Sequence, residues 1–129
     1  MTKPNEDFGL DQIGQIAIPV SDVERAIAFY RDVLGMRFLF QAPPGLGFFD
    51  CGGVRIMLDG PAAEQAGQSS VLYYRVEDLD AACETLSARG VVFERDPHLV
   101  AKLPDHELWM AFLRDPDNNL LALMSEVRP

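Results

Sequence analysis

The sequence contains one pattern of residues twice, and this internal repeat constrains the fold more than any other feature. The first copy begins at Gln15 and reads Q-I-A-I-P-V-S-D-V-E-R-A-I-A-F-Y-R-D-V-L-G-M-R-F. The second begins at Val71 and reads V-L-Y-Y-R-V-E-D-L-D-A-A-C-E-T-L-S-A-R-G-V-V-F. Asp22 and Asp78 are 56 positions apart, whereas the glycines that follow the two helices are 55 apart, so the second helix is one residue shorter. The repeat predicts two half-sized modules.

Each copy is typical of a strand followed by an amphipathic helix and further strands. Ile16 and Ile18 alternate with Gln15 and Ala17, as in a strand with one buried face. Ser21 and Glu24 have the spacing of a capping box, with Asp22 adding negative charge to the first helical turn. The first module is therefore expected to have strands at 13–20, 36–41, 46–51 and 54–58 and a helix from 22 to a stop at Gly35.

The second module is expected to have strands at 71–76, 91–94, 108–113 and 120–124 and a helix from 78 to 90. Residues 59–70 form a small, polar linker. About ten extra residues fall at 96–107, and such additions usually lie at a surface or a pocket mouth. The chain is thus interpreted as one domain, 1–129, with a loose arm at 1–11, module one at 12–59 and module two at 70–126.

The charge of the chain excludes some partners. Twenty acidic residues against eleven basic ones give a net charge of -9, which repels phosphate backbones and anionic membranes. We therefore expect no nucleic acid and no membrane as partners, while a cationic small molecule would be attracted. The sequence begins without the basic start and apolar run of a signal peptide, and its two cysteines suit reduced thiols, so a cytoplasmic location is predicted.

Three stretches together resemble the vicinal oxygen chelate superfamily. They are Q-I-A-I-P-V-S-D, F-Y-R-D-V-L-G-M and F-L-R-D-P-D-N-N-L-L-A-L, and the resemblance extends from about residue 13 to 126. This superfamily includes glyoxalase I, bleomycin-resistance proteins and extradiol dioxygenases. The resemblance implies an α+β, glyoxalase-like fold of two tandem βαβββ modules that form a shared curved-sheet cleft, often in a homodimer.

The resemblance also implies where a metal would be held. In the metal-dependent members, four positions facing the cleft carry His, Glu or Gln, and here they are Gln15, Met57, Val71 and Ala122. Only Gln15 has an oxygen that a hard divalent metal binds, and one neutral amide is too weak a donor set. We therefore predict ligand-binding roles for these four positions and no cofactor, with a divalent metal only in an alternative function.

Other residues are candidates for contact with a ligand. Tyr73 and Arg75 have the strand parity of Val71, so both are expected to face the cleft, Tyr73 as a stacking wall and Arg75 as an anion anchor or as the partner of an acidic residue. Trp109 can line a pocket, although a place in the core or a dimer interface is the favoured explanation. His98 is a candidate ligand contact and His106 a candidate general base, while surface-loop roles explain both as well.

These observations favour a protein that has lost the usual metal ligands and binds or sequesters a small molecule in its cleft. The alternative is a lyase, an isomerase or a dioxygenase-like enzyme acting on a small carbonyl or acid substrate, through His106 or a relocated metal. A third possibility is an interaction module whose cleft is filled by its own side chains.

Overall fold

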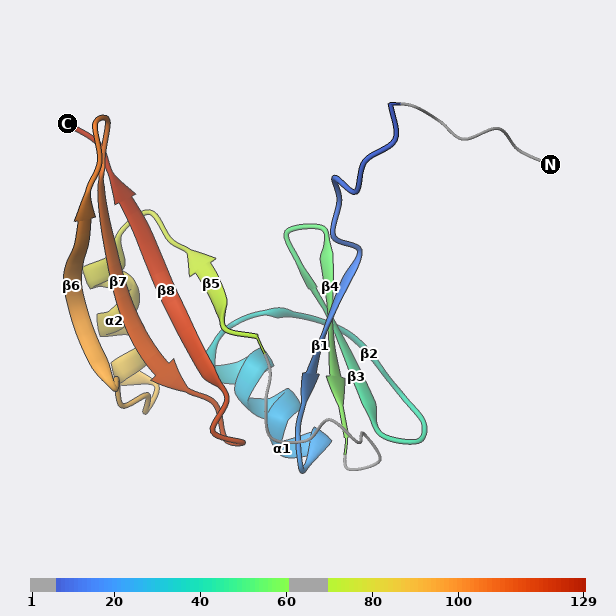
Figure 1. Cartoon of the computed structure of the whole chain (residues 1–129). Helices are drawn as coiled ribbons and strands as arrows, with labels where there is room; N and C mark the ends of the chain where they lie inside the picture. Colours follow the sequence, from blue (N-terminus) through green and yellow to red (C-terminus); the bar gives the residue numbers. More distant parts are fainter. Residues whose placement is uncertain (1–6, 61–69) are drawn as a thin grey trace.

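The computed structural model describes residues 7–60 and 70–129, so residues 1–6 of the predicted arm and most of the predicted linker lie outside the described residues. Figure 1 shows two modules, each with a four-stranded sheet. The first contains β1 (Gln15–Pro19), α1 (Val23–Ala28), η1 (Phe29–Val33), β2 (Arg37–Ala42), β3 (Leu46–Cys51) and β4 (Val54–Asp59). The second contains β5 (Leu72–Arg75), α2 (Leu79–Ala88), β6 (Arg95–Lys102), β7 (Glu107–Arg114) and β8 (Leu120–Val127).

The two sheets have the same topology. Sheet A has the strand order β1-β4-β3-β2, and sheet B has the order β5-β8-β7-β6. In each sheet the first strand pairs in parallel with the last one, and the other pairs are antiparallel. This arrangement confirms the predicted α+β class and the two repeated modules.

The first helix differs from the prediction in its start and its second half. Asp22, not Ser21, is the N-cap, since its carboxylate accepts a hydrogen bond from the backbone N–H of Arg25 at 3.2 Å. After Ala28 the helix continues as the π-helix η1, in which the N–H of Leu34 donates to the carbonyl oxygen of Phe29 at 3.0 Å. A π-turn accommodates one more residue than an α-turn. It therefore explains why the repeat has one residue more in its first helix.

The second module corrects the predicted strand at 91–94. That segment contains no strand, Val92 within it is 87% exposed, and β6 begins at Arg95. The residues expected as an insertion are instead most of a long β6–β7 hairpin, with a short turn at its tip. This hairpin could not be predicted from the sequence because D-P-H-L-V-A-K-L lacks the regular alternation of a half-buried strand. The structural reason is that two register shifts interrupt the β6–β7 pairing.

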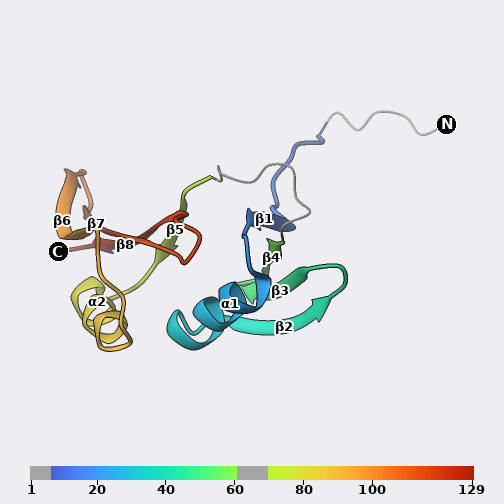
Figure 2. The same cartoon turned by 90° about the horizontal axis from the view of Figure 1, so that it is seen from below.

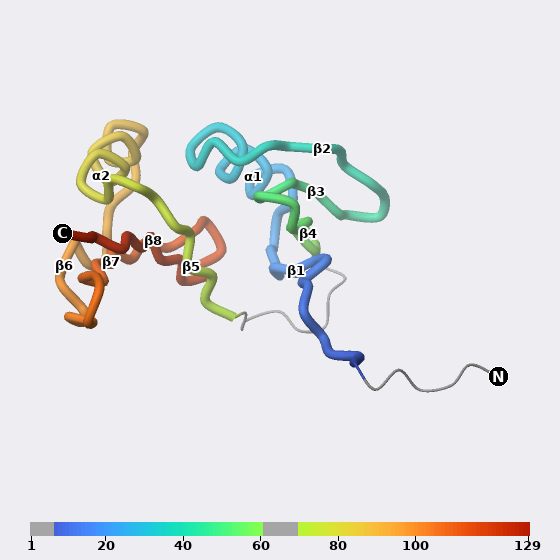
Figure 3. Tube along the Cα trace, turned by 90° about the horizontal axis from the view of Figure 1, so that it is seen from above, coloured from blue at the N-terminus to red at the C-terminus, as the bar shows by residue number. Residues whose placement is uncertain are grey.

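A single apolar core joins the modules. Figure 2, seen from below, shows both helices inside the corner that the two sheets form, and Figure 3 shows the same arrangement from above. The core contains residues of both helices and both sheets: Ile18, Ala26, Ile27, Tyr30, Phe49, Ile56, Leu58, Leu79, Cys83, Leu86, Ala111, Leu113, Leu121 and Leu123, among others. Each sheet thus packs one face on the shared core and turns its other face outward. None of the described helices is long and apolar enough to cross a membrane.

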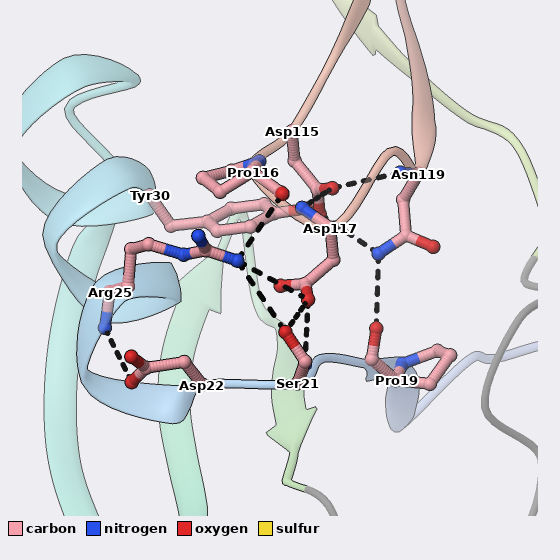
Figure 4. A network of polar contacts seen from close by, with 9 residues as sticks. All are labelled: Pro19, Ser21, Asp22, Arg25, Tyr30, Asp115, Pro116, Asp117 and Asn119. Carbon is pink, nitrogen blue, oxygen red and sulfur yellow. Dashed lines mark hydrogen bonds and ion pairs between the residues drawn. The ribbon is translucent and has the colours of Figure 1, made fainter.

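The turn between β7 and β8 fastens module two onto module one (Figure 4). Asp115 is 5% exposed and accepts hydrogen bonds from the hydroxyl of Tyr30 and from the backbone N–H groups of Asp117 and Asn119, at 2.8–2.9 Å. Asp117 in turn accepts hydrogen bonds from the backbone N–H and the hydroxyl of Ser21. The Asn119 amide donates to the carbonyl oxygen of Pro19 at 3.0 Å. We call residues 115–119 the clasp.

Candidate functional site

The outward face of sheet A carries the first two positions expected to face a cleft. Ile16 and Ile18 point into the core, so Gln15 and Ala17 point outward. Ala17 pairs with Met57 on β4, and the Gln15 amide nitrogen lies 3.7 Å from the Met57 sulfur. The structure therefore brings Gln15 and Met57 together, as expected from the sequence. The two groups that meet here are an amide and a thioether.

Aromatic side chains extend this face across the sheet. Phe40 and Phe48 stack with ring centroids 4.8 Å apart, and the guanidinium of Arg55 lies 5.9 Å from the centroid of Phe48. Phe40 is 50% exposed. Strand parity alone would have put it on the same side as the core residue Phe38. A register shift between Phe38 and Phe40 turns it outward, and nothing in the sequence marked that bulge.

The outward face of sheet B carries the second pair of expected positions. Ala122 is fully buried and is the strand partner of both Tyr73 and Phe112. Tyr73 contacts Phe112 edge to face at 6.3 Å, and the ring of His98 stacks on Phe112 at 6.0 Å. Val71 lies one residue before β5 and is half-buried. Tyr73, Phe112 and His98 thus form an aromatic surface around Ala122.

Arg75 lies on this same outward face, at the end of β5. Its guanidinium is 4.0 Å from the carboxylate of Glu126, and its side chain is 73% exposed. A contact of this length between exposed groups contributes little to stability. Arg75 is therefore held loosely enough to contact an anionic group on a ligand.

Trp109 does not join these residues, and the expectation that it lines the cleft needs correction. It packs against the core, on the side of sheet B that faces α2, and its indole N–H donates to Glu107 at 3.1 Å. On β7 the outward residues are Met110 and Phe112, because successive side chains alternate between the faces. Trp109 therefore packs with the core, which is one of the alternatives to a place in the cleft.

The two histidines are far apart in the fold. His98 lies on β6 and its Nδ1 is 2.8 Å from the carbonyl oxygen of Asp96, which makes Nδ1 the protonated nitrogen in the neutral ring and leaves Nε2 as the acceptor. His106 lies at the hairpin tip, where its Nδ1 is 2.8 Å from a carboxylate oxygen of Asp105. His106 is six residues from Phe112, about 20 Å along an extended strand. It instead lines a separate hollow of about 410 Å³ with Arg128 and the C-terminal residues.

The side chains at the four expected positions do not fit a divalent metal. They offer one amide oxygen and one thioether, whereas the hard and borderline metals require several carboxylate, imidazole or thiolate donors. Within residues 7–60 and 70–129, no group of three or more His, Cys, Asp or Glu side chains is arranged to hold a metal ion. No step of a metal-assisted reaction can therefore be assigned to these residues.

The two outward faces lie on different sides of one chain. Both helices lie in the corner between the two sheets (Figure 2), and the helix-facing side of each sheet is buried in the shared core. By strand alternation Gln15 and Met57 on one sheet, and Ala122 and Tyr73 on the other, therefore point away from that corner. A cleft that contains all four expected positions therefore requires sheet A of one chain and sheet B of another.

Comparison with known proteins identifies the family of the chain. A model of the Glyoxalase/Bleomycin resistance protein/Dioxygenase superfamily matches residues 12–123. The chain belongs to this superfamily. The superfamily resemblance seen in the sequence is thus confirmed, and residues 12–123 span both modules and the clasp.

Three relatives illustrate the range of the superfamily. The protein YraH of Bacillus subtilis (strain 168) is 29% identical over 126 residues, covering 84% of this chain and 94% of the relative. A probable lactoylglutathione lyase of Vibrio cholerae serotype O1 is 30% identical over 118 residues, covering 81% and 83%. The crystal structure of TnmS3, an antibiotic binding protein from Streptomyces sp. CB03234, has a TM-score of 0.73 and 26% identity, covering 92% of this chain and 98% of that chain.

Proposed function

We propose that this protein is a homodimer that binds or sequesters a small aromatic molecule, without a divalent metal, between sheet A of one subunit and sheet B of the other. The observation that carries the proposal is the composition of the two outward faces. Where metal-dependent relatives place ligands, this chain has Gln15, Met57 and Ala122, and around them it has aromatic rings in stacked and edge-to-face contact. Such surfaces suit flat rings and lack the donors that a metal needs.

The dimer follows from the direction of the faces. Phe40 and Tyr73 are each 50% exposed, on faces that point away from one another within a chain. A ligand on one face alone would keep its other side in water, whereas a pocket normally buries most of its ligand. β1 and β5 are both edge strands, so each can pair with a second chain. The TnmS3 relative is described as an antibiotic binding protein, which supports a binding role.

Two variants test whether the site is shared between subunits. Proflavine, a planar aromatic cation, is titrated by fluorescence against Phe48→Ala, which changes sheet A, and Phe112→Ala, which changes sheet B. Each substitution removes a stacking ring and is expected to raise the dissociation constant about tenfold, because one ring contact is worth about 1–3 kcal/mol.

Mixing the two variants after unfolding and refolding distinguishes the arrangements. After random reassociation about half of the dimers are heterodimers. A heterodimer with shared sites contains one site with both rings intact and one with neither, so about a quarter of all sites are expected to regain the original affinity. Sites confined to single chains would regain nothing, and that result would contradict the shared site. A monomer at micromolar concentration in light scattering would contradict it as well.

The metal prediction is tested separately. Protein purified without chelator is expected to contain no stoichiometric Zn²⁺, Ni²⁺, Mn²⁺ or Fe²⁺ by elemental analysis, and proflavine binding is expected to survive dialysis against EDTA. One tightly held ion per chain would overturn the metal-free proposal, whatever the outcome of the mixing experiment.

The enzyme alternative is supported by the similarity to the Vibrio cholerae protein, whose description is a probable lactoylglutathione lyase. On this chain His98 is the better placed base, because it lies beside Phe112 on the outward face with Nε2 as its acceptor nitrogen. If the chain is a lyase, His98→Gln should lower turnover of the hemithioacetal of glutathione and methylglyoxal by about 10²-fold, and His106→Gln should not. No turnover by the unmodified protein would reject this alternative.

A further inference from the structure

A second pocket lies on the opposite side of the molecule from the proposed ligand faces. It has a volume of about 360 Å³ and is formed where the modules meet, between the start of β2, the end of β3, β5 and α2. Met36, Cys51 and Leu86 are among its apolar lining residues. A volume of this order is that of a small-molecule site. We call it the seam pocket, and its lining residues come from both halves of the repeat.

Tyr74, which lines the seam pocket, carries a hydroxyl that has no hydrogen-bond partner among the described residues. The hydroxyl of Tyr74 is inaccessible to solvent, and within the described residues it makes no hydrogen bond. A buried hydroxyl without a partner is destabilising, and such groups are rare in folded proteins. Burial raises the pKa of Tyr74, so the hydroxyl keeps its proton and remains a hydrogen-bond donor. It therefore offers a donor to an acceptor atom that reaches it when the side chains covering the hydroxyl shift.

The charge of the lining is opposite to that of the whole chain. The protein has a net charge of -9, yet the residues that line the seam pocket include one arginine, Arg89, and no carboxylate. The Nη1 of Arg89 donates to the carbonyl oxygen of Val33 at 2.9 Å. That bond positions the guanidinium beside the pocket and leaves the N–H groups of Nε and Nη2 for other acceptors. The lining thus offers a cation to an anionic ligand, while the buried Asp115 lies near enough to add to the effect of burial in raising the pKa of Tyr74.

We propose that the seam pocket is a binding site for a small, mainly apolar carboxylic acid. The hydrocarbon part of the acid lies against Met36 and Leu86, an oxygen accepts the hydrogen bond of the Tyr74 hydroxyl, and Arg89 balances the negative charge. This site is separate from the proposed dimer cleft, because Tyr74 and Tyr73 point to opposite faces of β5. It is independent of the function proposed above.

The test uses 2-naphthoate as the anionic probe and 2-naphthamide as its neutral counterpart, titrated into the full-length protein by calorimetry. We expect one naphthoate per chain and at least tenfold weaker binding of the amide. Tyr74→Phe removes only the hydroxyl and is expected to weaken naphthoate binding about tenfold, the effect of one charge-assisted hydrogen bond. The thermal midpoint of the ligand-free variant should stay equal or rise, because a buried group without a partner is removed.

Two further variants decide where the probe binds. Ala82→Leu places a larger side chain in the pocket lining and should abolish naphthoate binding. Tyr73→Phe makes the same change as Tyr74→Phe on the outward face of β5 and reports on the other site. Loss of affinity in Tyr73→Phe but not in Tyr74→Phe would overturn the seam pocket and leave the dimer cleft standing. Naphthoate binding unchanged in both Tyr74→Phe and Ala82→Leu, or no binding at millimolar probe, would overturn it too.

Discussion

The two modules share one topology, but the corresponding turns of their last hairpins have different tasks. In module one the turn between β3 and β4 is Gly52-Gly53, and the Asp50 side chain accepts one hydrogen bond, from the N–H of Gly53 at 3.2 Å. In module two the turn is the clasp, and Asp115 is buried against Tyr30 of the other module. A repeat therefore specifies the shape of each module, while one modified turn specifies how the modules are joined.

The largest expected effect comes from removing the centre of the clasp. Asp115→Ala leaves the Tyr30 hydroxyl and the N–H groups of Asp117 and Asn119 without their acceptor in a buried place. We expect a loss of about 3–5 kcal/mol in the free energy of unfolding, measured with urea.

Asp50→Ala is the matched control in module one. It removes one exposed hydrogen bond and is expected to cost less than about 1 kcal/mol. Equal losses in the two variants would show that the turns are equivalent and that the clasp does not hold the modules together.

A smaller effect is expected where each helix approaches its sheet. A Cβ on Gly47 of β3 would lie 2.9 Å from Cγ1 and Cδ1 of Ile27, so the Ile27 side chain of α1 fills the space that a side chain here needs, unless Ile27 or the helix shifts. Gly47→Ala should therefore destabilise the protein by about 1–3 kcal/mol through overpacking. In sheet B, β7 has Ala111 on its helix-facing side, fully buried.

The reverse substitution, Ala111→Gly, tests whether α2 leaves room for that methyl group. It should cost about 1 kcal/mol, because it adds backbone freedom and leaves a small gap. The two losses of stability are compared by measuring the thermal midpoints of Gly47→Ala and Ala111→Gly against the unmodified protein. A neutral Gly47→Ala would mean that α1 can move away from its sheet without loss.

A modest change at neutral pH is expected for Tyr30→Phe. The ring stays in the core, while Asp115 loses one of its donors, so we expect a loss of about 1–2 kcal/mol. Burial and the neighbouring Asp115 raise the pKa of Tyr30 far above its usual value of 10.0.

This raised pKa gives the effect a pH dependence. Above about pH 10 the unfolded chain releases the Tyr30 proton while the folded chain retains it, so the stabilisation is complete below pH 10 and falls as the pH rises. The unmodified protein should lose about 1.4 kcal/mol per pH unit relative to Tyr30→Phe in that range. Urea midpoints measured from pH 7 to 11 will show whether the two curves converge; a constant gap would contradict the assigned burial of Tyr30.

Much of the fold could be predicted because it depends on local patterns. Strand alternation and the stop glycines located both helices and six of the eight strands closely, and the one-residue difference between the copies marked the π-turn without revealing its form. β6 was misplaced because its residues do not alternate regularly. The outward position of Phe40 depends on a β-bulge in β2. The inward position of Trp109 depends on the exact register of β7. Neither the bulge nor the register can be predicted from the identity of single residues.

The sequence by itself determined the repeat, the superfamily and the identities of Gln15, Met57, Val71 and Ala122 at the positions where the resemblance implies metal ligands, because each of these is a matter of residue identity and spacing. Only the tertiary structure decided that the two outward faces diverge, that the 115–119 turn is a clasp, and that the Tyr74 hydroxyl is buried without a partner among the residues the structure describes. These features depend on which surfaces of the two modules pack together. That choice minimises the exposed apolar area of both helices at once, a property of the whole chain and not of any segment.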